Sequence, residues 1–180
     1  MKLERLTDFE SENFKKAIDL YELSFPVLER RDEDEQYRVL KNKNYCFDVI
    51  TENDEFIGIM LYWEVNGLIF LEHFATRKDI RGKGYGSKAL ELLKASGKPV
   101  LLEIEPPVDE LTERRYGFYK RNGFVMNPYK HIQAKYRQGD RALELKVLTY
   151  PQVVKKEGYD AFYEYMLREI AVRFEKQQNL

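Results

Sequence analysis

The chain is short of the residues that several kinds of site require. Its 180 residues include one cysteine and two histidines. One cysteine excludes a disulfide within the chain, and three such side chains in all are too few for the usual Cys/His zinc cage. We therefore expect a protein without a bound metal or an internal cross-link.

Long apolar runs and an excess of charge of one sign are also missing. No apolar run approaches the ~20 residues of a membrane span. Residues 1–16 carry charges throughout and lack the apolar core of a secretory signal. The formal net charge is −1, which gives no general attraction to nucleic acid or to an anionic membrane. We expect a cytoplasmic protein with neither partner.

Apolar and aromatic residues are abundant. They make up 43% and 14% of the chain, which is enough for a sizeable core. We expect a single domain over residues 1–180, with its core in 1–149 and a helical extension in 150–180. The extension, with a helix from about residue 155 to 176, carries an apolar face that would pack on the sheet or across a homodimer interface. The residues of this face are Tyr159, Phe162, Tyr163, Met166, Ile170 and Phe174.

The order of the predicted elements indicates an α/β fold with a mixed sheet. Asn66-Gly67 is a strong hairpin signal, so residues 56–65 and 68–75 should pair antiparallel. A helix then leads to a strand at 100–104, and such a β-α-β unit makes the strands at 68–75 and 100–104 parallel. The other expected strands are 2–6, 45–51, 124–126 and 142–149, and the other expected helices begin at Thr7 or Ser11, at Asp32 and at about Glu110.

Three glycines at alternate positions, Gly82, Gly84 and Gly86, separate the hairpin from the helix that follows it. A helix begins with unpaired N–H groups and the positive end of its dipole, and glycines let an anion approach them closely. Several cations lie near this turn in the sequence: Arg77, Lys78, Arg81, Lys83 and Lys88. The pattern predicts a phosphorylated ligand, most simply a pyrophosphate.

Three kinds of phosphate site use a glycine-rich turn before a helix. The P-loop string is absent, and a dinucleotide-binding Gly-x-Gly-x-x-Gly is one residue longer than the spacing found here. Glu103 and Glu105 do fall where a ribose-binding acid would lie. However, a dinucleotide-binding turn follows its strand tightly, and that strand is usually the first of a parallel set. Here the preceding strand is the second arm of a hairpin, and six residues separate Ala75 from Gly82, which argues against a dinucleotide site. The third pattern is Arg-x-x-Gly-x-Gly, which fits Arg81 to Gly86.

At this point the sequence resembles the GNAT superfamily of acetyl-CoA-dependent N-acetyltransferases. Arg81-Gly82-Lys83-Gly84-Tyr85-Gly86 is similar to the family signature, and FYKRNGF, residues 118–124, is similar to its Phe-Tyr-x-x-x-Gly-Phe motif. The resemblance covers roughly residues 1–149. It implies the GNAT fold, a mixed central sheet flanked by helices, here with a C-terminal helical extension. It also implies acetyl-CoA as cosubstrate.

The resemblance further implies catalytic residues. Glu72 would be the general base and Tyr119 would protonate the departing thiolate, with Glu103 and Glu105 as alternative bases. By strand alternation we expect Glu72 to share a face with Phe70 and Phe74, and His73 to face oppositely with Leu71 and Ala75. Partial burial should raise the pKa of Glu72 toward a useful range.

The resemblance also assigns the cofactor contacts. A backbone N–H near Phe74 or Ala75 would face the oxyanion. The pyrophosphate would lie on the turn and the first helical residues, which are Arg81, Gly82, Lys83, Gly84, Tyr85, Gly86 and Ser87. The chain departs from the family at Thr112 and Arg115, where many members have an asparagine and an alanine.

These inferences predict an N-acetyltransferase in which a primary amine of a small molecule or peptide attacks acetyl-CoA directly in a ternary complex. The alternative is a catalytically silent CoA-binding regulatory module of the same fold. We expect Cys46 in the core, and His131 exposed in a polar surface connection over residues 127–142. The sequence does not identify the acceptor.

Overall fold

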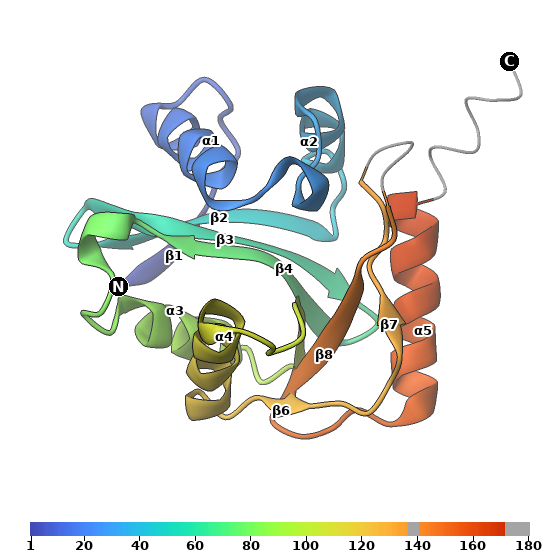
Figure 1. Ribbon diagram of the computed structural model, residues 1–180. Coiled ribbons are helices and arrows are strands. Elements are labelled where there is room, and N and C mark those ends of the chain that lie inside the picture. Colours follow the sequence, from blue (N-terminus) through green and yellow to red (C-terminus); the bar gives the residue numbers. More distant parts are fainter. Residues whose placement is uncertain (137–140, 172–180) are drawn as a thin grey trace, which may run out of the picture.

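The computed structural model describes residues 1–136 and 141–171. Within them, eight strands form a mixed sheet in the order β1-β2-β3-β4-β5-β8-β6, and β7 pairs with β8 (Figure 1). The strands are β1 (Lys2–Arg5), β2 (Tyr45–Glu52), β3 (Glu55–Val65), β4 (Leu68–Thr76), β5 (Val100–Ile104), β6 (Val125–Met126), β7 (His131–Ile132) and β8 (Glu144–Tyr150). The helices are α1 (Glu12–Ser24), η1 (Val27–Glu29), α2 (Glu33–Val39), η2 (Lys78–Ile80), α3 (Tyr85–Lys94), α4 (Glu110–Arg121), α5 (Lys156–Met166) and η3 (Leu167–Ala171).

Short polar residues set the first turns of three helices. Of the two predicted starts of α1, Ser11 is correct, because its hydroxyl accepts from the Phe14 N–H at 3.2 Å. The Asp32 carboxylate caps α2 in the same way. Asp109 and Thr112 form a reciprocal capping box at the start of α4. Each side chain satisfies an N–H group that the helix itself leaves unpaired.

The predicted hairpin and crossover are both confirmed. Asn66 and Gly67 have φ of 48° and 83°, as a type I′ turn requires, and β3 pairs antiparallel with β4. After α3 the chain returns as β5, which pairs parallel with β4. This parallel register places the start of α3 beyond the carboxyl end of β4.

Two hydrophobic cores lie on opposite faces of the sheet. Figure 1 shows α1 and α2 on one face and α3 and α4 on the other. The first core also contains Phe162 and Met166 of α5, so that helix packs on the α1 face of the sheet, as one of the two predicted packings had it. Leu90 and Leu93 of α3 belong to the second core, together with Cys46, which is buried as expected.

A β-bulge in β4 changes the predicted alternation of its side chains. Tyr62 lies opposite Leu71 and Leu61 lies opposite His73, so Glu72 has no partner on β3. Two consecutive residues, Glu72 and His73, therefore face the α1 side of the sheet.

The predicted sharing of faces in β4 is right for Glu72 with Phe70 and for His73 with Ala75, but all four side chains lie on the α1 face and the rest of the prediction is wrong. Beyond the bulge Phe74 packs in the second core while Ala75 packs in the first. Glu72 thus does not share a face with Phe74, and His73 does not lie on the face of Leu71. Strand alternation assumes one residue opposite one residue, and the bulge breaks that count.

The C-terminal helix, predicted for about residues 155–176, is described as far as Ala171. Regular α-helix ends at Met166, and Leu167–Ala171 continue with the wider turns of a π-helix. Tyr159, Phe162 and Met166 are buried, as expected for an apolar face. Phe174 lies outside the described residues.

Candidate active site

The central feature is the point where β4 and β5 stop pairing. Their parallel register joins three residue pairs and ends with Leu71 opposite Leu102. The next residue on each strand is a glutamate, Glu72 on β4 and Glu103 on β5. Both side chains are almost wholly buried, at 0% and 7% exposure. Two buried carboxylates therefore lie directly after the last residues that pair between these strands.

The glycine turn joins β4 to α3. Gly82 and Gly84 have φ of 82° and 81°, and a Cβ atom added to either would meet no atom within 4 Å. Gly84 is the N-cap of α3 and has no side-chain oxygen to cap the helix, so the N–H groups of the first turn remain available. Arg81 to Gly84 are exposed. This turn is a cradle of open backbone with a positive dipole end behind it.

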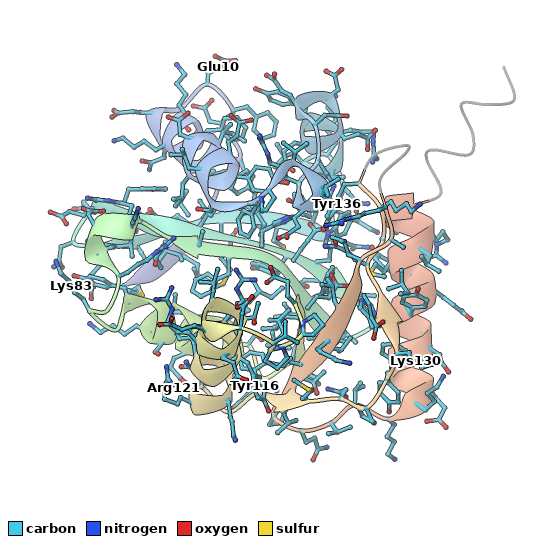
Figure 2. The ribbon with its side chains drawn as sticks, viewed as in Figure 1. Glu10, Lys83, Tyr116, Arg121, Lys130 and Tyr136 are labelled. Carbon is cyan, nitrogen blue, oxygen red and sulfur yellow. The ribbon has the colours of Figure 1, made fainter. Side chains whose placement is uncertain are left out.

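The turn is also rich in cationic side chains. Lys83 lies at the outer rim of the molecule beside it (Figure 2). Lys88, one turn into α3, lies 3.4 Å from Glu52 and stands over the Tyr85 ring. Lys83 and Arg81 are exposed, and both can approach an anion on the turn.

Gly86 has a packing role that differs from that of the other two glycines. A Cβ atom here would lie 3.2 Å from the Phe118 ring, and Phe118 stacks on Phe74 with ring centroids 6.5 Å apart. Glycine at this position lets the start of α3 approach α4 and the carboxyl end of β4. The signature turn, β4 and the Phe-Tyr motif are thus packed together.

Glu72 does not stand free at the site. Its carboxylate accepts two hydrogen bonds from the Arg31 guanidinium, at 2.8 and 2.6 Å, and one each from Trp63 Nε1 and the Tyr136 hydroxyl. Three aromatic rings surround the guanidinium, at 5.0–5.7 Å from ring centroid to Cζ. These rings belong to Tyr45, Trp63 and Tyr136. Figure 2 shows Tyr136 where the α2 side of the sheet meets the β7 and β8 strands.

The predicted direction of the Glu72 pKa is therefore wrong. Burial by itself would raise the pKa of Glu72, but the charge of the Arg31 guanidinium and its two hydrogen bonds to the carboxylate outweigh it. They hold the pKa of this carboxyl well below its ordinary value. A carboxylate held by a guanidinium is a weak proton acceptor, because protonation would break the buried ion pair.

Tyr119 lies on α4 at the edge of the second core. Its ring packs edge-on against Phe118 and Phe124, with centroids 5.1 and 5.6 Å apart. Burial raises the pKa of Tyr119 to about 12, against a smaller opposite effect of the Arg115 charge. The phenol is thus protonated at neutral pH and can donate a hydrogen.

The two alternative bases have different surroundings. Glu105 pairs with Arg115 of α4, and both side chains are about two-fifths exposed. Glu103 contacts His131 Nε2, and the opposite ring nitrogen of His131 lies 3.0 Å from the Tyr159 hydroxyl. His131 is fully buried, so the expectation that it is exposed is wrong. The segment after β6 forms the strand β7, which pairs antiparallel with β8.

The two departures from the family pattern have structural explanations. Thr112 closes the capping box of α4: its hydroxyl accepts from the Val108 and Asp109 N–H groups, both at 3.0 Å. Arg115 pairs with Glu105. Neither contact requires a ligand.

Other candidate sites in the described part of the chain are weak. No cluster of three or more His, Cys, Asp or Glu side chains among residues 1–136 and 141–171 could hold a metal ion. In the same residues, no helix is both long and apolar enough to cross a membrane. A surface hollow of about 470 Å³ lies beside β1 and the start of α1 and is lined in part by Glu4, Thr7 and Asn13. It includes no residue of the signature turn, so we do not assign the chemistry to it.

Sequence reasoning missed Arg31, Tyr136 and the pair of His131 with Tyr159. Arg31 and Tyr136 come from loops, where no periodicity marks a buried residue. His131 could have been singled out only because the chain has two histidines.

Comparison with known proteins points to acetyltransferases throughout. The model of the acetyltransferase (GNAT) family matches residues 11–124. YjbC of Bacillus subtilis (strain 168), provisionally named an acetyltransferase, is 34% identical over 113 residues, which are 61% of this chain and 54% of YjbC. The match thus spans about half the length of that relative.

Solved structures share the fold. A Bacteroides thetaiotaomicron protein, provisionally assigned as an acetyltransferase of the GNAT family, is 27% identical with a TM-score of 0.89. The alignment covers 95% of this chain and 98% of that one. A GNAT family acetyltransferase from Elizabethkingia anophelis with acetyl-CoA bound is 16% identical with a TM-score of 0.57, over 82% of this chain and 95% of that one. At that identity the likeness concerns the fold alone.

Proposed function

The chain belongs to the GNAT family of acetyltransferases, and on that premise we propose that it transfers the acetyl group of acetyl-CoA to a primary amine. The observation that carries the proposal is the glycine turn before α3. The backbone at Gly82 and Gly84 is open and has the left-handed conformation, which residues other than glycine rarely adopt. That cradle, on a helix N-terminus with Arg81 and Lys83 beside it, suits a pyrophosphate.

The proposed cofactor contacts run from the end of β4 into α3. The N–H groups from Arg81 to Ser87 would hold the pyrophosphate, with Gly82, Lys83, Gly84, Tyr85 and Gly86 between them. A backbone N–H near Phe74 or Ala75 would face the oxygen that gains negative charge in the transition state. These positions lie on packed elements, since Phe74, Gly86 and Phe118 are in contact.

Tyr119 is proposed as the proton donor to the leaving thiolate. It belongs to the Phe-Tyr motif, lies next to Phe118 and is protonated at neutral pH. The acceptor amine must in turn lose a proton before it attacks, because an alkyl ammonium has a pKa of about 10.4.

Glu72 remains a predicted base whose surroundings favour a different role. In the structure it anchors Arg31, and through Arg31 the loop between α1 and α2, to the face of the sheet. This gives the alternative function, a catalytically silent CoA-binding module, one specific observation in its favour. The two proposals differ in turnover and agree in CoA binding. A cytoplasmic location and a homodimer also remain proposals.

A thermal-shift experiment tests the cofactor first. The chain is melted with acetyl-CoA, free CoA, NADH and ATP in parallel. A ligand that binds only the folded chain at one hundred times its Kd stabilises it by about 2.7 kcal/mol, which is readily measured. We expect a shift with acetyl-CoA and CoA alone. A shift with NADH would contradict the assignment of CoA as the ligand, and no shift with any of the four would contradict the pyrophosphate assignment.

A thiol-release assay then separates enzyme from silent module. The acceptors are spermidine, an aminoglycoside and a peptide with an N-terminal alanine, because proteins of the same fold are named for the acetylation of spermidine, of aminoglycosides and of a ribosomal-protein alanine. Acetyl transfer to any of them supports the enzyme. Binding of CoA without transfer to any amine, including n-butylamine, favours the silent module.

A further inference from the structure

The surroundings of Arg31 have the form of a receptor for a guanidinium group. The Glu72 carboxylate accepts two hydrogen bonds from this guanidinium, at 2.8 and 2.6 Å, and three aromatic rings stand 5.0–5.7 Å from its Cζ atom. We call this arrangement of Glu72 with the rings of Tyr45, Trp63 and Tyr136 the Glu72 cage. Aromatic rings attract a cation through their faces, and a carboxylate that accepts two parallel N–H bonds selects a guanidinium over a compact ammonium.

The Glu72 cage requires a cation but does not require that this cation belong to the chain. The Glu72 side chain has no exposed surface, and that of Arg31 is 3% exposed. A carboxylate buried to this extent must be paired, since an isolated buried charge is very costly. A guanidinium on a ligand can form the same two hydrogen bonds. Exchange of Arg31 for such a ligand therefore keeps the ion pair, whereas a neutral ligand would break it.

The chain segment that carries Arg31 has no other fully buried side chain. In residues 22–35, all of which the structure describes, Arg31 is the one buried residue. The Arg31 N–H donates to the Tyr21 hydroxyl at 3.0 Å, and the Glu29 carbonyl lies 2.6 Å from His73 Nε2. Withdrawal of Arg31 from the cage would thus break a few polar contacts and would expose no further core residue of this segment.

The Glu72 cage lies close to the proposed reaction centre. Glu72 comes directly after the last residue of β4 that pairs with β5. Phe74 and Ala75, near which the oxyanion contact is proposed, follow two and three residues later, which is about 7–10 Å along a strand at ~3.3 Å per residue. A primary amine joined to a guanidinium by a short alkyl chain can span this distance.

We propose that the Glu72 cage binds a guanidinium group of the acceptor, and that Arg31 occupies the cage until such an acceptor displaces it. Arg31 is then an internal competitor of the substrate. Glu72 is a specificity-determining residue that holds the far end of the acceptor and not its reacting nitrogen. The proposal rests on the proposed acetyltransferase function and names the substrate class, a primary amine that also carries a guanidinium group.

The guanidinium takes no part in the bond changes. The ammonium end of the acceptor loses one proton to solvent, and the neutral amine forms the N–C bond as the C–S bond of the thioester breaks. The departing thiolate takes the Tyr119 hydrogen, and the second proton of the nitrogen restores the Tyr119 hydroxyl. The cage remains an ion pair throughout, because a guanidinium has an ordinary pKa above ~12. Its contribution is to position the acceptor.

Trp63 reports on the cage without any need for turnover. It is the single tryptophan of the chain, and its indole N–H donates to the Glu72 carboxylate at 3.1 Å. The isotopically labelled full chain is titrated with agmatine, which has a primary amine and a guanidinium, and with its neutral urea analogue of the same shape. We expect a saturable shift of the indole N–H signal with agmatine alone. A signal that agmatine does not move, or that both compounds move equally, would overturn the proposal.

Arg31→Ala removes the internal competitor. The agmatine Kd measured through Trp63 should fall by about tenfold or more, since the binding-competent state no longer has to be reached by displacement. Arg31→Lys leaves a charge in the cage but cannot form the paired hydrogen bonds, so it is the second variant and should also tighten binding. Arg30→Ala is the matched control, because Arg30 pairs with the exposed Glu22 and should leave the Kd at its wild-type value. Unchanged affinity in both Arg31 variants would overturn the displacement.

Turnover tests the substrate class separately. In the thiol-release assay with acetyl-CoA, kcat/KM for agmatine should exceed that for the urea analogue by about tenfold or more, the effect of losing hydrogen bonds between charged groups. Equal values for the two acceptors would contradict the guanidinium class while leaving the acetyltransferase function in place. Agmatine binding at Trp63 without thiol release from any amine would contradict the proposed function, while the guanidinium site would stand.

Discussion

At the scale of single residues, the site is defined by what each carboxylate is paired with. Glu72 is held by a guanidinium inside an aromatic cage, whereas Glu103 is held by an imidazole. The sequence places both on apolar strands and does not distinguish them, because their partners come from loops and from a distant strand. Arg31 is 41 residues from Glu72 in the chain, and His131 is 28 residues from Glu103.

Removing the charge of Glu72 should destabilise the fold. Glu72→Gln leaves Arg31 buried without a counter-charge, which typically costs about 3–5 kcal/mol. Urea unfolding at pH 7 measures the loss. Glu64→Gln is the matched control, since Glu64 is half-exposed and its pair with Lys98 is a surface one, worth at most about 1 kcal/mol. Equal losses in the two variants would contradict the assigned ion pair.

The same pair predicts a pH dependence. The pKa of Glu72 is lower in the folded chain than its ordinary value of 4.5, so between the two values the unfolded chain binds the proton more strongly. The stabilisation is therefore complete above about pH 5 and is lost as the pH falls through the folded value. The gap in unfolding free energy between wild type and Glu72→Gln should be smaller at pH 3 than at pH 7. A gap that widens in acid would refute the sign.

Tyr119 should act on turnover and not on binding. Tyr119→Phe removes the hydroxyl hydrogen but keeps the ring packed on Phe118 and Phe124. We expect kcat to fall about 10²-fold, with the CoA Kd unchanged within about twofold. Tyr116→Phe on the same helix is the control, and it should behave as wild type. A Tyr119→Phe enzyme with the wild-type rate would remove this residue from the mechanism.

At the scale of elements, the turn into α3 combines backbone conformation with charge. The glycines at 82 and 84 are needed for φ and for space, whereas the glycine at 86 is needed for the contact with Phe118. A substitution at either of the first two positions therefore adds a side chain on the turn that would hold the phosphate, without a clash inside the protein.

Gly84→Asp should abolish CoA binding and leave the chain folded. Two unit charges about 4 Å apart repel by about 4 kcal/mol at an effective dielectric constant of 20, or roughly a thousandfold in Kd. Gly67→Asp is a close control, because Gly67 has φ of +83° and equally open space but lies in the β3–β4 hairpin. Both variants carry the same backbone strain. Calorimetric titration with CoA should fail for Gly84→Asp alone; unchanged affinity in a folded Gly84→Asp chain would disprove the turn assignment.

Local signals predicted most of the elements and their pairing. Asn66-Gly67 fixed the hairpin, the return through α3 fixed the parallel pair, and Ser11 and Asp32 marked helix starts. The bulge at Glu72 was not predictable from β4 alone, because it is a mismatch in length between two strands. The burial of His131 was not predictable either. Its strand, β7, is only two residues long, and the ring that covers His131 belongs to Phe162 of α5, far along the chain.

At the scale of the whole molecule, one sheet separates two cores that must fold together. Trp63, the single tryptophan, is buried on the α1 face, whereas Leu90 of α3 is buried on the other. Strands β2, β3 and β4 contribute side chains to both cores. Because these strands are shared, neither core can lose its packing while the other keeps its own.

Leu90→Ala should therefore lower the stability reported by Trp63. The cavity costs about 2–5 kcal/mol, and the midpoint of the Trp63 fluorescence transition should fall together with that of far-UV circular dichroism, as a two-state transition requires. Leu23→Ala on the exposed side of α1 is the control and should leave both midpoints within about 0.5 kcal/mol of wild type. A fluorescence midpoint that stays at its wild-type value in Leu90→Ala would show that the two faces unfold separately.

The bulge in β4 has a consequence for how relatives of this chain are compared. Nine residues of β4, Leu68–Thr76, lie opposite Gly58–Val65 of β3, which is one residue fewer. A relative that lacked this extra residue would have a regular ladder, and its acidic residue and its histidine would lie on opposite sides of the sheet. An alignment gap inside β4 therefore changes which side chains lie on the α1 face of the sheet, and is more than a difference in strand length.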